Sequence, residues 1–284
     1  MVMGNLREFE YAEPASLEEA ISILGRNEDA RVLAGGTDLI LGMRQRKIEP
    51  RAIVNIKRIP GLDRMLIDEH GGLRIGALVT MDAIERSEFV QTAFPILAHA
   101  AQKLGSFQIR NRATIGGNLC NASPAADTAP PLIALGAVVK LTGAEGERLV
   151  KLEDFFAGPG KTVLSKGEVL TEVDVPSQAR ESFGAYLKHG PRNAMDIATV
   201  NAAIMFALHE QKCAEARIAL GSVAPVPLRA RKAETEIHGK MIDESSVSRV
   251  AEVASEECSP ISDLRGSAEY RKAMVKVLVR RLFG

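Results

Sequence analysis

Along about residues 1–60, the spacing of apolar side chains alternates between a helical and a strand-like pattern. Several apolar side chains at three- and four-residue spacing predict one face of an amphipathic helix: Leu17, Ala20, Ile21 and Leu24. The Ser16 and Glu19 pair predicts the capping box that starts this helix, and Gly25 predicts its end. The chain from Asp38 onward is again expected to be helical. Two apolar runs predict buried strands, which would complete a small αβ subdomain: residues 31–33 and 52–56.

Shorter elements alternate over about residues 61–177, which we expect to form a second subdomain. Strands are predicted at three places: residues 73–76, 137–141 and 167–175. Helices are predicted at three others: residues 81–85, 96–103 and 132–135. Asp127 is placed to cap the last of these helices. Residues 108–114 are predicted to be extended as they lead into a glycine-rich segment.

From residue 185 onward, predicted strands come before predicted helices. The strands are residues 185–188, 197–208 and 214–221. The helices are residues 228–236, 244–256 and 268–282. This order predicts an α+β domain with a three-stranded sheet. The polar residues 178–180 are expected to form a hinge, so the predicted domains are residues 1–177 and 178–284.

The composition is typical of a globular protein with a sizeable core, because 46% of the 284 residues are hydrophobic and 25% are charged. Thirty-six basic residues balance thirty-six acidic ones, so no net field favours nucleic acid or an anionic membrane. An aromatic content of 4% without Trp argues against stacking on single-stranded nucleic acid. The chain has no run of about 18 apolar residues and no apolar signal-peptide stretch near its start. We therefore expect a cytoplasmic protein without a membrane span.

Cysteine and histidine usage argues against a metal centre within the chain. Cys120, Cys213 and Cys258 are widely spaced and cannot supply the set of thiolates that a [2Fe–2S] cluster needs. The five histidines show no ligand spacing, and no catalytic triad can be read from the sequence. Cys120 lies beside a glycine-rich segment, where we expect it to be a small buried hydrophobic side chain rather than a ligand contact.

Two segments combine adjacent glycines with polar side chains: residues 33–40 (LAGGTDLI) and 114–118 (TIGGN). Paired glycines allow positive φ and a close approach to a ligand, and successive N–H groups can then form an anion-binding nest. Two such nests suit a diphosphate held by separate segments. For either segment alone, a simple tight turn is the commoner explanation. Neither matches G-x-G-x-x-G or G-x-x-x-x-G-K-[ST], so the standard nucleotide-binding motifs are absent.

AGGTDL, followed about 80 residues later by TIGGNLCNASPAADTAP, resembles the FAD-binding subunit of the molybdenum hydroxylases, the family of xanthine dehydrogenase and aerobic carbon monoxide dehydrogenase. The similarity continues in the family's order and covers nearly the whole chain: GEVLTEVDVP, YLKHGPRNAMDIATV, ALGSVAPVPLRA and RGSAEYRKAMVKVLVRRL. It implies a p-cresol methylhydroxylase-type FAD-binding fold with two N-terminal subdomains. It also implies that the C-terminal α+β domain closes over the flavin.

By this resemblance, the chain is expected to be the flavoprotein subunit of a molybdenum-containing hydroxylase complex. A large molybdopterin subunit would oxidise the substrate, and a small subunit with [2Fe–2S] clusters would pass on the electrons. FAD on this chain would hand them to NAD⁺, a quinone or another external acceptor. The expected assembly is (αβγ)2. Two alternatives stay open: a self-sufficient FAD-dependent oxidoreductase, and a non-redox nucleotide-binding assembly module.

The resemblance also assigns cofactor contacts to individual residues of the two glycine segments. The first segment would wrap the FAD diphosphate, with polar contacts from the threonine and the aspartate: Leu33, Ala34, Gly35, Gly36, Thr37, Asp38, Leu39 and Ile40. The second segment would supply another set of N–H donors, a hydroxyl and a side-chain amide: Thr114, Ile115, Gly116, Gly117 and Asn118.

Further contacts are implied outside the two segments. Leu104 is expected to lie against the cofactor, and Leu170 matches another contact position. Asp127 would hydrogen-bond FAD, with the helix cap as its alternative or additional role. Lys188 would bring a positive charge near the flavin or its diphosphate; the alternative is a surface lysine.

Asp196 and Ile197 match the segment beside the isoalloxazine ring, where Ile197 would shield one face. Arg192 lies upstream in the same loop, in a stretch that influences access of the electron acceptor in some relatives. We find no His, Tyr or Cys placed for covalent attachment of the flavin, so non-covalent FAD is expected.

The final predicted helix is strongly basic: Arg271, Lys272, Lys276, Arg280 and Arg281. Such charges usually form a solvated face that complements the dipole at the helix C-terminus. The alternative is a docking surface for a partner subunit.

Overall fold

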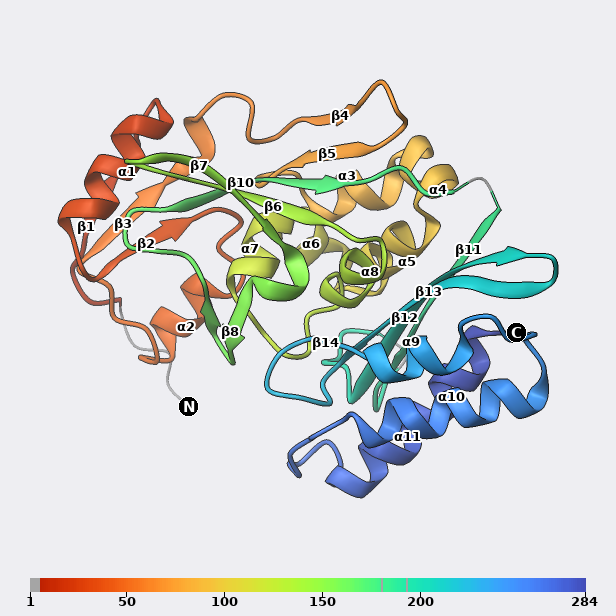
Figure 1. Ribbon diagram of the computed structural model, residues 1–284. Coiled ribbons are helices and arrows are strands. Elements are labelled where there is room, and N and C mark those ends of the chain that lie inside the picture. The colour runs from red at the N-terminus through yellow and green to blue at the C-terminus, as the bar shows by residue number, and fades with distance from the viewer. Residues whose placement is uncertain (1–5, 180, 193) are drawn as a thin grey trace.

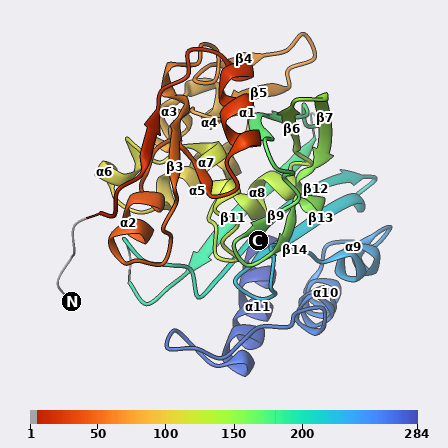
Figure 2. The ribbon, with the colours of Figure 1, turned by 90° about the vertical axis from the view of Figure 1, so that its left-hand side faces the viewer.

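The computed structural model describes residues 6–179, 181–192 and 194–284. Arg180, at the predicted hinge, and Asn193 lie outside the described residues. The strands form sheets of three, five, four and two strands. The three-stranded sheet and the C-terminal helices lie at opposite ends of the molecule, with the five-stranded sheet and its helices between them (Figures 1 and 2). Within the described ranges, no helix has the length and hydropathy needed to cross a membrane.

A parallel sheet forms the N-terminal end, in the order β1 (Glu10–Ala12), β3 (Ala52–Asn55), β2 (Ala30–Leu33). The chain passes from β1 to β2 through α1 (Leu17–Arg26), and from β2 to β3 through α2 (Leu39–Arg44). The 3₁₀ helix η1 (Ile56–Arg58) follows β3 directly. Because all three strands are parallel, their carboxyl ends share one edge, the edge at which open α/β sheets bind ligands. The first glycine segment and η1 both begin there.

Helix α1 starts as predicted but ends later. The Ser16 hydroxyl accepts the Glu19 N–H at 3.2 Å, which confirms the cap. The Glu19 carboxylate accepts the N–H of Ala15 at 3.0 Å, one residue earlier than in a standard capping box. The prediction that Gly25 ends the helix is wrong, because the N–H of Asn27 still donates to a helix carbonyl.

An antiparallel sheet of five strands forms the centre, in the order β4 (Met65–Ile67), β5 (Leu73–Gly76), β10 (Val169–Val175), β6 (Val138–Gly143), β7 (Gly146–Lys151). Six helices belong to this part: α3 (Met81–Arg86), α4 (Glu88–Ala93), α5 (Pro95–Lys103), α6 (Phe107–Arg110), α7 (Ile115–Cys120) and α8 (Ala129–Ala134). The 3₁₀ helix η2 (Leu152–Asp154) and the short pair β8 (Phe156–Gly158) and β9 (Lys161–Thr162) follow β7 in the chain.

Two predictions for this region are wrong in the same way. Residues 108–114 are not extended throughout, because the Ser106 hydroxyl accepts the Ile109 N–H at 3.3 Å and starts α6. The second glycine segment is likewise the first part of a helix, α7, whose N-cap is Thr114. In both places a hydroxyl cap overrides the extended or turn conformation that the local sequence suggests.

The C-terminal sheet has three long antiparallel strands, as predicted, and a short fourth one. Its order is β11 (Ser182–His189), β12 (Val200–His209), β13 (Lys212–Gly221), β14 (Leu228–Arg229). The helices that follow are α9 (Arg231–Ile237), α10 (Glu244–Glu256) and α11 (Ala268–Leu282). The α+β class is therefore confirmed, while β14 occupies residues predicted to begin a helix.

The C-terminal sheet contributes to two cores at once. Along β12, Ala202 and Ile204 are buried with residues of α9, α10 and α11. The intervening Ala203 and Met205 are buried with residues of α5, α8 and the central sheet. This alternation follows from the two-residue period of a strand, which points successive side chains to opposite faces. Both faces of β12 are therefore covered.

The basic helix α11 is not uniformly a charged surface. Arg271 is only 2% exposed, and its guanidinium donates to the main-chain oxygens of Thr199 at 2.7 Å and Ser222 at 3.0 Å. It also pairs with Asp263 at 2.7 Å. The inclusion of Arg271 in a solvated or docking face is therefore wrong, because the helix turns this residue toward the sheet. Arg280 and Arg281 are exposed.

Candidate functional site

The two glycine segments lie next to each other. A Cβ on Gly35 would lie 2.0 Å from the main-chain oxygen of Arg112, just before the second segment. A Cβ on Gly117 would lie 4.0 Å from the Cβ of Ala34. Gly35 is thus required for the close approach of the two backbones. The structure brings together the two segments that the sequence singled out.

The first segment has the backbone of an anion-binding nest. Gly36 has φ +78°, a conformation that L side chains rarely adopt. Among the described residues, the N–H groups of Gly35, Gly36, Thr37 and Asp38 have no hydrogen-bond acceptor. Asp38 occupies the N-cap position of α2, yet its side chain makes no capping bond. Successive free N–H groups around a left-handed glycine suit an anionic ligand.

The second segment differs from its expected role. The N–H groups of Ile115 and Gly116 donate to Val79 and Ala77 main-chain oxygens, both at 3.0 Å. The N–H of Gly117 donates to the Thr114 hydroxyl at 3.1 Å, and that of the following residue donates to the Thr114 main-chain oxygen. The expectation that this whole segment supplies N–H donors is therefore wrong. Within this segment, the Thr114 N–H alone has no acceptor among the described residues.

Side chains of the second segment still have free hydrogen-bonding capacity. The Thr114 hydroxyl accepts one bond and keeps its own hydrogen, and Asn118 uses its side-chain oxygen to accept the Thr128 hydroxyl at 2.6 Å. The Asn118 NH₂ group is left to donate. A Cβ on Gly116 would lie 2.7 Å from that of Ala77, so this glycine serves close packing against the central sheet.

Lys188 is the centre of a buried polar network. Its ammonium nitrogen donates to Asp127 Oδ2 at 2.9 Å, and only 6% and 9% of the two side chains are exposed. The Tyr186 hydroxyl donates to Asp127 Oδ1 at 2.9 Å. Burial raises the pKa of the Asp127 carboxyl, while the bonds from Lys188 and Tyr186 act in the opposite direction. Lys188 is therefore not a surface lysine.

Asp127 does not cap α8. Thr128 occupies the N-cap position and makes no side-chain capping bond, because its hydroxyl is directed to Asn118. The carboxylate of Asp127 is used by the β11 side chains instead. The N-cap prediction for Asp127 is thus wrong. Asp127 is still linked to the second glycine segment, because the hydroxyl of the next residue, Thr128, donates to the side chain of Asn118.

Lys188 also connects the residues expected beside the flavin ring. Its ammonium nitrogen donates to the main-chain oxygens of Lys103 at 3.1 Å and Asp196 at 3.0 Å. Leu104 follows Lys103 and is buried, whereas Ile197 follows Asp196 and is 53% exposed. One side chain thereby fixes the backbone just before each of these two apolar residues.

Arg192 and Asp196 shape the loop between β11 and β12. The Asp196 carboxylate accepts the Arg192 N–H at 3.3 Å, and the Arg192 guanidinium donates to the main-chain oxygen of Met195. Met195 has φ +56°, an uncommon conformation for a residue with a side chain. The Arg192 side chain is exposed at the surface of this loop.

The side chain of Leu170 lies apart from these groups. It is 3% exposed in the core of β10, so only its main chain could contact a ligand. The next residue, Thr171, accepts the N–H of Ala77 at 2.9 Å, and Ala77 in turn accepts the N–H of Gly116. Leu170 is thus part of the backbone support beneath the second segment.

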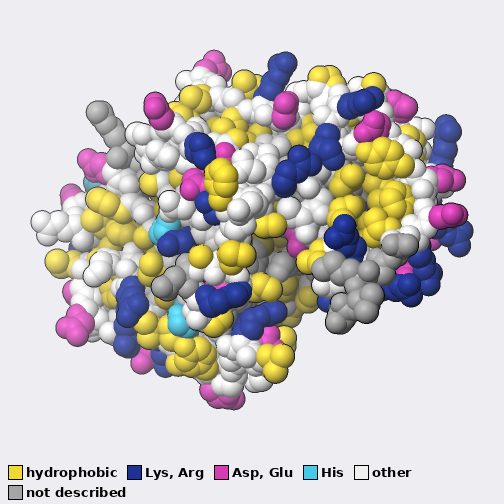
Figure 3. Space-filling model, turned by 180° about the vertical axis from the view of Figure 1, so that it is seen from behind, with side chains coloured by type: hydrophobic (Ala, Val, Ile, Leu, Met, Phe, Trp, Pro, Cys, Tyr) yellow, Lys and Arg dark blue, Asp and Glu magenta, His cyan; other side chains and the backbone are white. Residues whose placement is uncertain are grey.

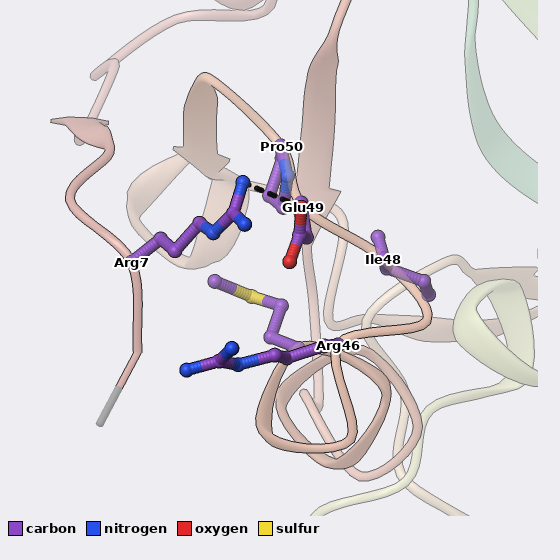
Figure 4. Close-up of a pocket in the computed structure, with 6 residues that line it drawn as sticks. Arg7, Arg46, Ile48, Glu49 and Pro50 are labelled. Atoms are coloured by element: carbon purple, nitrogen blue, oxygen red, sulfur yellow. Dashed lines mark ion pairs between the residues drawn. The ribbon is translucent and has the colours of Figure 1, made fainter. Parts of the chain in front are cut away.

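Two cavities of the described chain lie away from these groups. One, of about 10 Å³, is lined by Arg7, Arg46 and neighbouring residues and contains the Arg7–Glu49 ion pair at 2.8 Å (Figure 4). A larger one, of about 440 Å³, lies between α4, the start of α5 and the start of β11. Neither is lined by a residue expected to contact the cofactor.

A family model described as the FAD binding domain in molybdopterin dehydrogenase matches residues 7–178, and the CO dehydrogenase flavoprotein C-terminal domain matches residues 185–284. The chain belongs to the FAD-subunit family of the molybdenum hydroxylases. The family prediction and the predicted α+β FAD-binding fold are thereby confirmed.

Several members of this family are similar over almost their whole length. The glyceraldehyde dehydrogenase medium chain of Sulfolobus acidocaldarius is 36% identical, with 97% of each chain covered. The xanthine dehydrogenase FAD-binding subunit of Escherichia coli O157:H7 is 33% identical, covering 96% of this chain and 94% of that one. The solved carbon monoxide dehydrogenase of Hydrogenophaga pseudoflava has a TM-score of 0.95 at 36% identity, covering 98% and 97% of the two chains.

Two residues of the candidate site were not predicted from the sequence. The Lys57 ammonium donates to the Ala34 main-chain oxygen at 3.2 Å, one residue before the nest. Its position just after a strand that is parallel to β2 is the signal that could have identified it. Tyr186 is fully buried against Asp127, and nothing in its local sequence distinguishes it from an ordinary core residue.

Cys120 behaves as expected for an apolar side chain. It packs against the central core, and burial raises the pKa of its thiol to about 12. A protonated thiol is a poor metal ligand and a poor nucleophile. Together with the segment before it, Cys120 therefore provides packing near the second glycine segment.

Proposed function

We propose that this chain binds one FAD non-covalently and is the flavoprotein subunit of a molybdenum-containing hydroxylase complex. The observation that supports it most directly is the nest at Gly35, Gly36, Thr37 and Asp38, whose N–H groups have no acceptor among the described residues. The second glycine segment lies next to this nest, and the match to the FAD binding domain in molybdopterin dehydrogenase covers both segments.

The residues of this chain would bind and orient the cofactor. The nest would hold the diphosphate, with Thr114 and Asn118 donating from the second segment. Leu104 and Ile197 would contact the flavin ring from two sides, since Lys188 fixes the backbone beside each of them. When bound, FAD supplies the redox chemistry, and the protein supplies binding, orientation and electrostatics.

The subunit would carry the last cofactor of an electron-transfer chain, before the external acceptor. A large molybdopterin subunit and a small subunit with [2Fe–2S] clusters would be its partners, in an (αβγ)2 assembly. Electrons would leave for NAD⁺, a quinone or another external acceptor. The medium-chain relatives support this division of labour by their names. We propose residues 1–177 as the FAD-binding domain and 178–284 as the domain that closes over the ring.

Anaerobic spectroscopy on the separate chain and on the assembled complex tests this function. The purified chain should show the visible absorption of flavin, and acid precipitation should release all of it as FAD into the supernatant. Substrates of the complex should leave the flavin of the separate chain oxidised. They should bleach it once the molybdenum- and cluster-bearing subunits are added.

The alternatives give different results in the same experiment. Bleaching of the separate chain by a substrate would identify a self-sufficient oxidoreductase. A colourless chain that cannot be loaded with FAD would identify a non-redox nucleotide-binding module. FMN in place of FAD would contradict the assignment of a diphosphate to the nest.

A further inference from the structure

We propose that Lys57 and Arg112 form a cationic pair that neutralises the diphosphate of the bound dinucleotide at the first glycine segment. The proposal rests on the proposed FAD function and adds charge recognition to the neutral N–H donors of the nest. The two residues come from different parts of the sequence, and each contacts or lies against the first glycine segment.

Lys57 is positioned by the sheet itself. Leu33 of β2 pairs with Asn55 of β3, so the first glycine segment and η1 leave neighbouring strands at the same level. The Asn55 side chain accepts the Lys57 N–H at 3.2 Å and fixes the start of η1. The Lys57 ammonium then reaches the Ala34 main-chain oxygen at 3.2 Å, one residue before the nest. One hydrogen of the ammonium is used there, and the others remain available.

Arg112 lies against the same segment. Its main-chain oxygen is the atom that a Cβ on Gly35 would strike, so its backbone lies directly against the nest. The Arg112 side chain is exposed. Burial of Lys57 lowers the pKa of its ammonium group, and the positive charge of Arg112 lowers that pKa further. Two like charges in this position repel each other, and an anion placed between them would relieve the repulsion.

Nearby carboxylates do not satisfy this pair. Among the described residues, neither Lys57 nor Arg112 forms an ion pair, and the negative charge that raises the pKa of Lys57 is that of Glu13. The Glu13 carboxylate already accepts hydrogen bonds from Tyr11 at 2.8 Å and from Asn55 at 2.8 Å. It also pairs with Arg58 at 3.4 Å. The Glu13 carboxylate is therefore already engaged by other donors.

The chemistry of a dinucleotide diphosphate matches this arrangement. Its bridging group carries two negative charges, and the nest offers only neutral N–H donors. Hydrogen bonds between charged partners are shorter and about twice as strong as neutral ones. A lysine can contact one phosphate as a point charge, while an arginine can donate two parallel bonds to the oxygens of the other.

The test is a titration of the full-length chain, stripped of flavin, with FAD at two salt concentrations. Lys57→Met and Arg112→Met should each weaken FAD binding by about tenfold to a hundredfold, the loss expected for one charge-assisted bond. Both variants should also show a weaker dependence of the dissociation constant on salt. Lys57→Arg, which keeps the charge, should bind FAD within a few-fold of wild type.

Arg58→Met is the matched control, since Arg58 is the next residue of η1 and pairs with Glu13 instead. It should leave FAD affinity and its salt dependence unchanged. Riboflavin, which lacks the diphosphate, should bind wild type and both variants equally. A Lys57→Met/Arg112→Met double variant that is folded by circular dichroism and binds FAD as tightly as wild type would overturn the cationic pair alone. A wild-type chain that binds no FAD would overturn both this pair and the proposed function.

Discussion

The ammonium nitrogen of Lys188 lies 2.9 Å from Asp127 Oδ2, and this contact joins the C-terminal sheet to the loop before α8 across a span of 61 residues. Both side chains are almost completely buried. The pair fixes the position of β11 relative to the second glycine segment, because Asp127 is followed by Thr128 and its bond to Asn118. This ion pair is therefore one of the contacts that hold the two proposed domains together, beside the core that they share.

Removing Lys188 should be costly to stability. Lys188→Met leaves the Asp127 carboxylate buried without its cation, and breaking a buried pair in this way typically costs about 3–5 kcal/mol. Adding Asp127→Asn should recover part of the loss. Urea unfolding of the single and double variants measures this. Arg148→Met breaks a more exposed pair with Glu168 and should cost about 1 kcal/mol or less. An equal cost for Lys188→Met and Arg148→Met would contradict the structural role of Lys188.

Gly36→Val should weaken FAD binding without preventing folding. A branched side chain disfavours the φ of +78° at this position, and its Cβ would lie 3.0 Å from the Leu33 side chain. Loss of two or more hydrogen bonds to a charged ligand should cost about 3 kcal/mol of binding free energy or more. Gly158→Val, at a position with open space around it, should leave affinity unchanged. FAD titration of both variants provides the measurement, and normal affinity in folded Gly36→Val would remove the nest from the diphosphate site.

His99 should give the protein a specific acid sensitivity. Burial and, to a lesser extent, the nearby charge of Lys103 lower the pKa of its imidazole from the ordinary 6.5. The folded state then binds fewer protons than the unfolded state, so stability present above pH 6.5 is lost as the pH falls through the lowered pKa. His99→Gln should reduce this loss. Denaturant unfolding at several pH values tests it, and parallel pH profiles for wild type and variant would refute the assignment.

Arg271 and Arg280 should differ sharply although both belong to α11. Arg271→Met removes the donor from two main-chain oxygens and leaves Asp263 without its buried partner. We expect a loss of about 3 kcal/mol in the free energy of unfolding. Arg280→Met, at an exposed position, should change it by about 0.5 kcal/mol or less. Thermal unfolding followed by calorimetry distinguishes the two variants. Similar melting temperatures would contradict the structural role of buried Arg271.

Elements with a sustained apolar period were predictable from the sequence, and short capped ones were not. Helices α1 and α10, and the long strand β12, all follow clear periodic patterns. Helix α6 begins because the Ser106 hydroxyl caps it, and α4 because Ser87 accepts the Val90 N–H at 3.4 Å. Serine at such positions is equally compatible with a turn. The periodic signal does not extend over such short helices.

The candidate site was predictable where it is continuous in sequence. The nest lies within consecutive residues, and paired glycines identify it. The use of the second segment's N–H groups by Val79 and Ala77 depends on tertiary packing that no local pattern contains. The same is true of Lys188, because two of its acceptors, Lys103 and Asp127, lie 85 and 61 residues away in the sequence. Resemblance could name these residues but could not show which atoms were already bonded.

The shared burial of β12 has a consequence for dissecting the protein into fragments. Ala203 and Met205 are buried in the core shared with the N-terminal part of the chain, and Ala202 and Ile204 in the core formed with the C-terminal helices. A truncation at residue 177 would expose one apolar face of the C-terminal sheet to solvent. It would also expose the surfaces of α5 and α8 that pack against this face. Each fragment would therefore expose aggregation-prone surface, and heating the intact chain should melt both halves in a single cooperative transition.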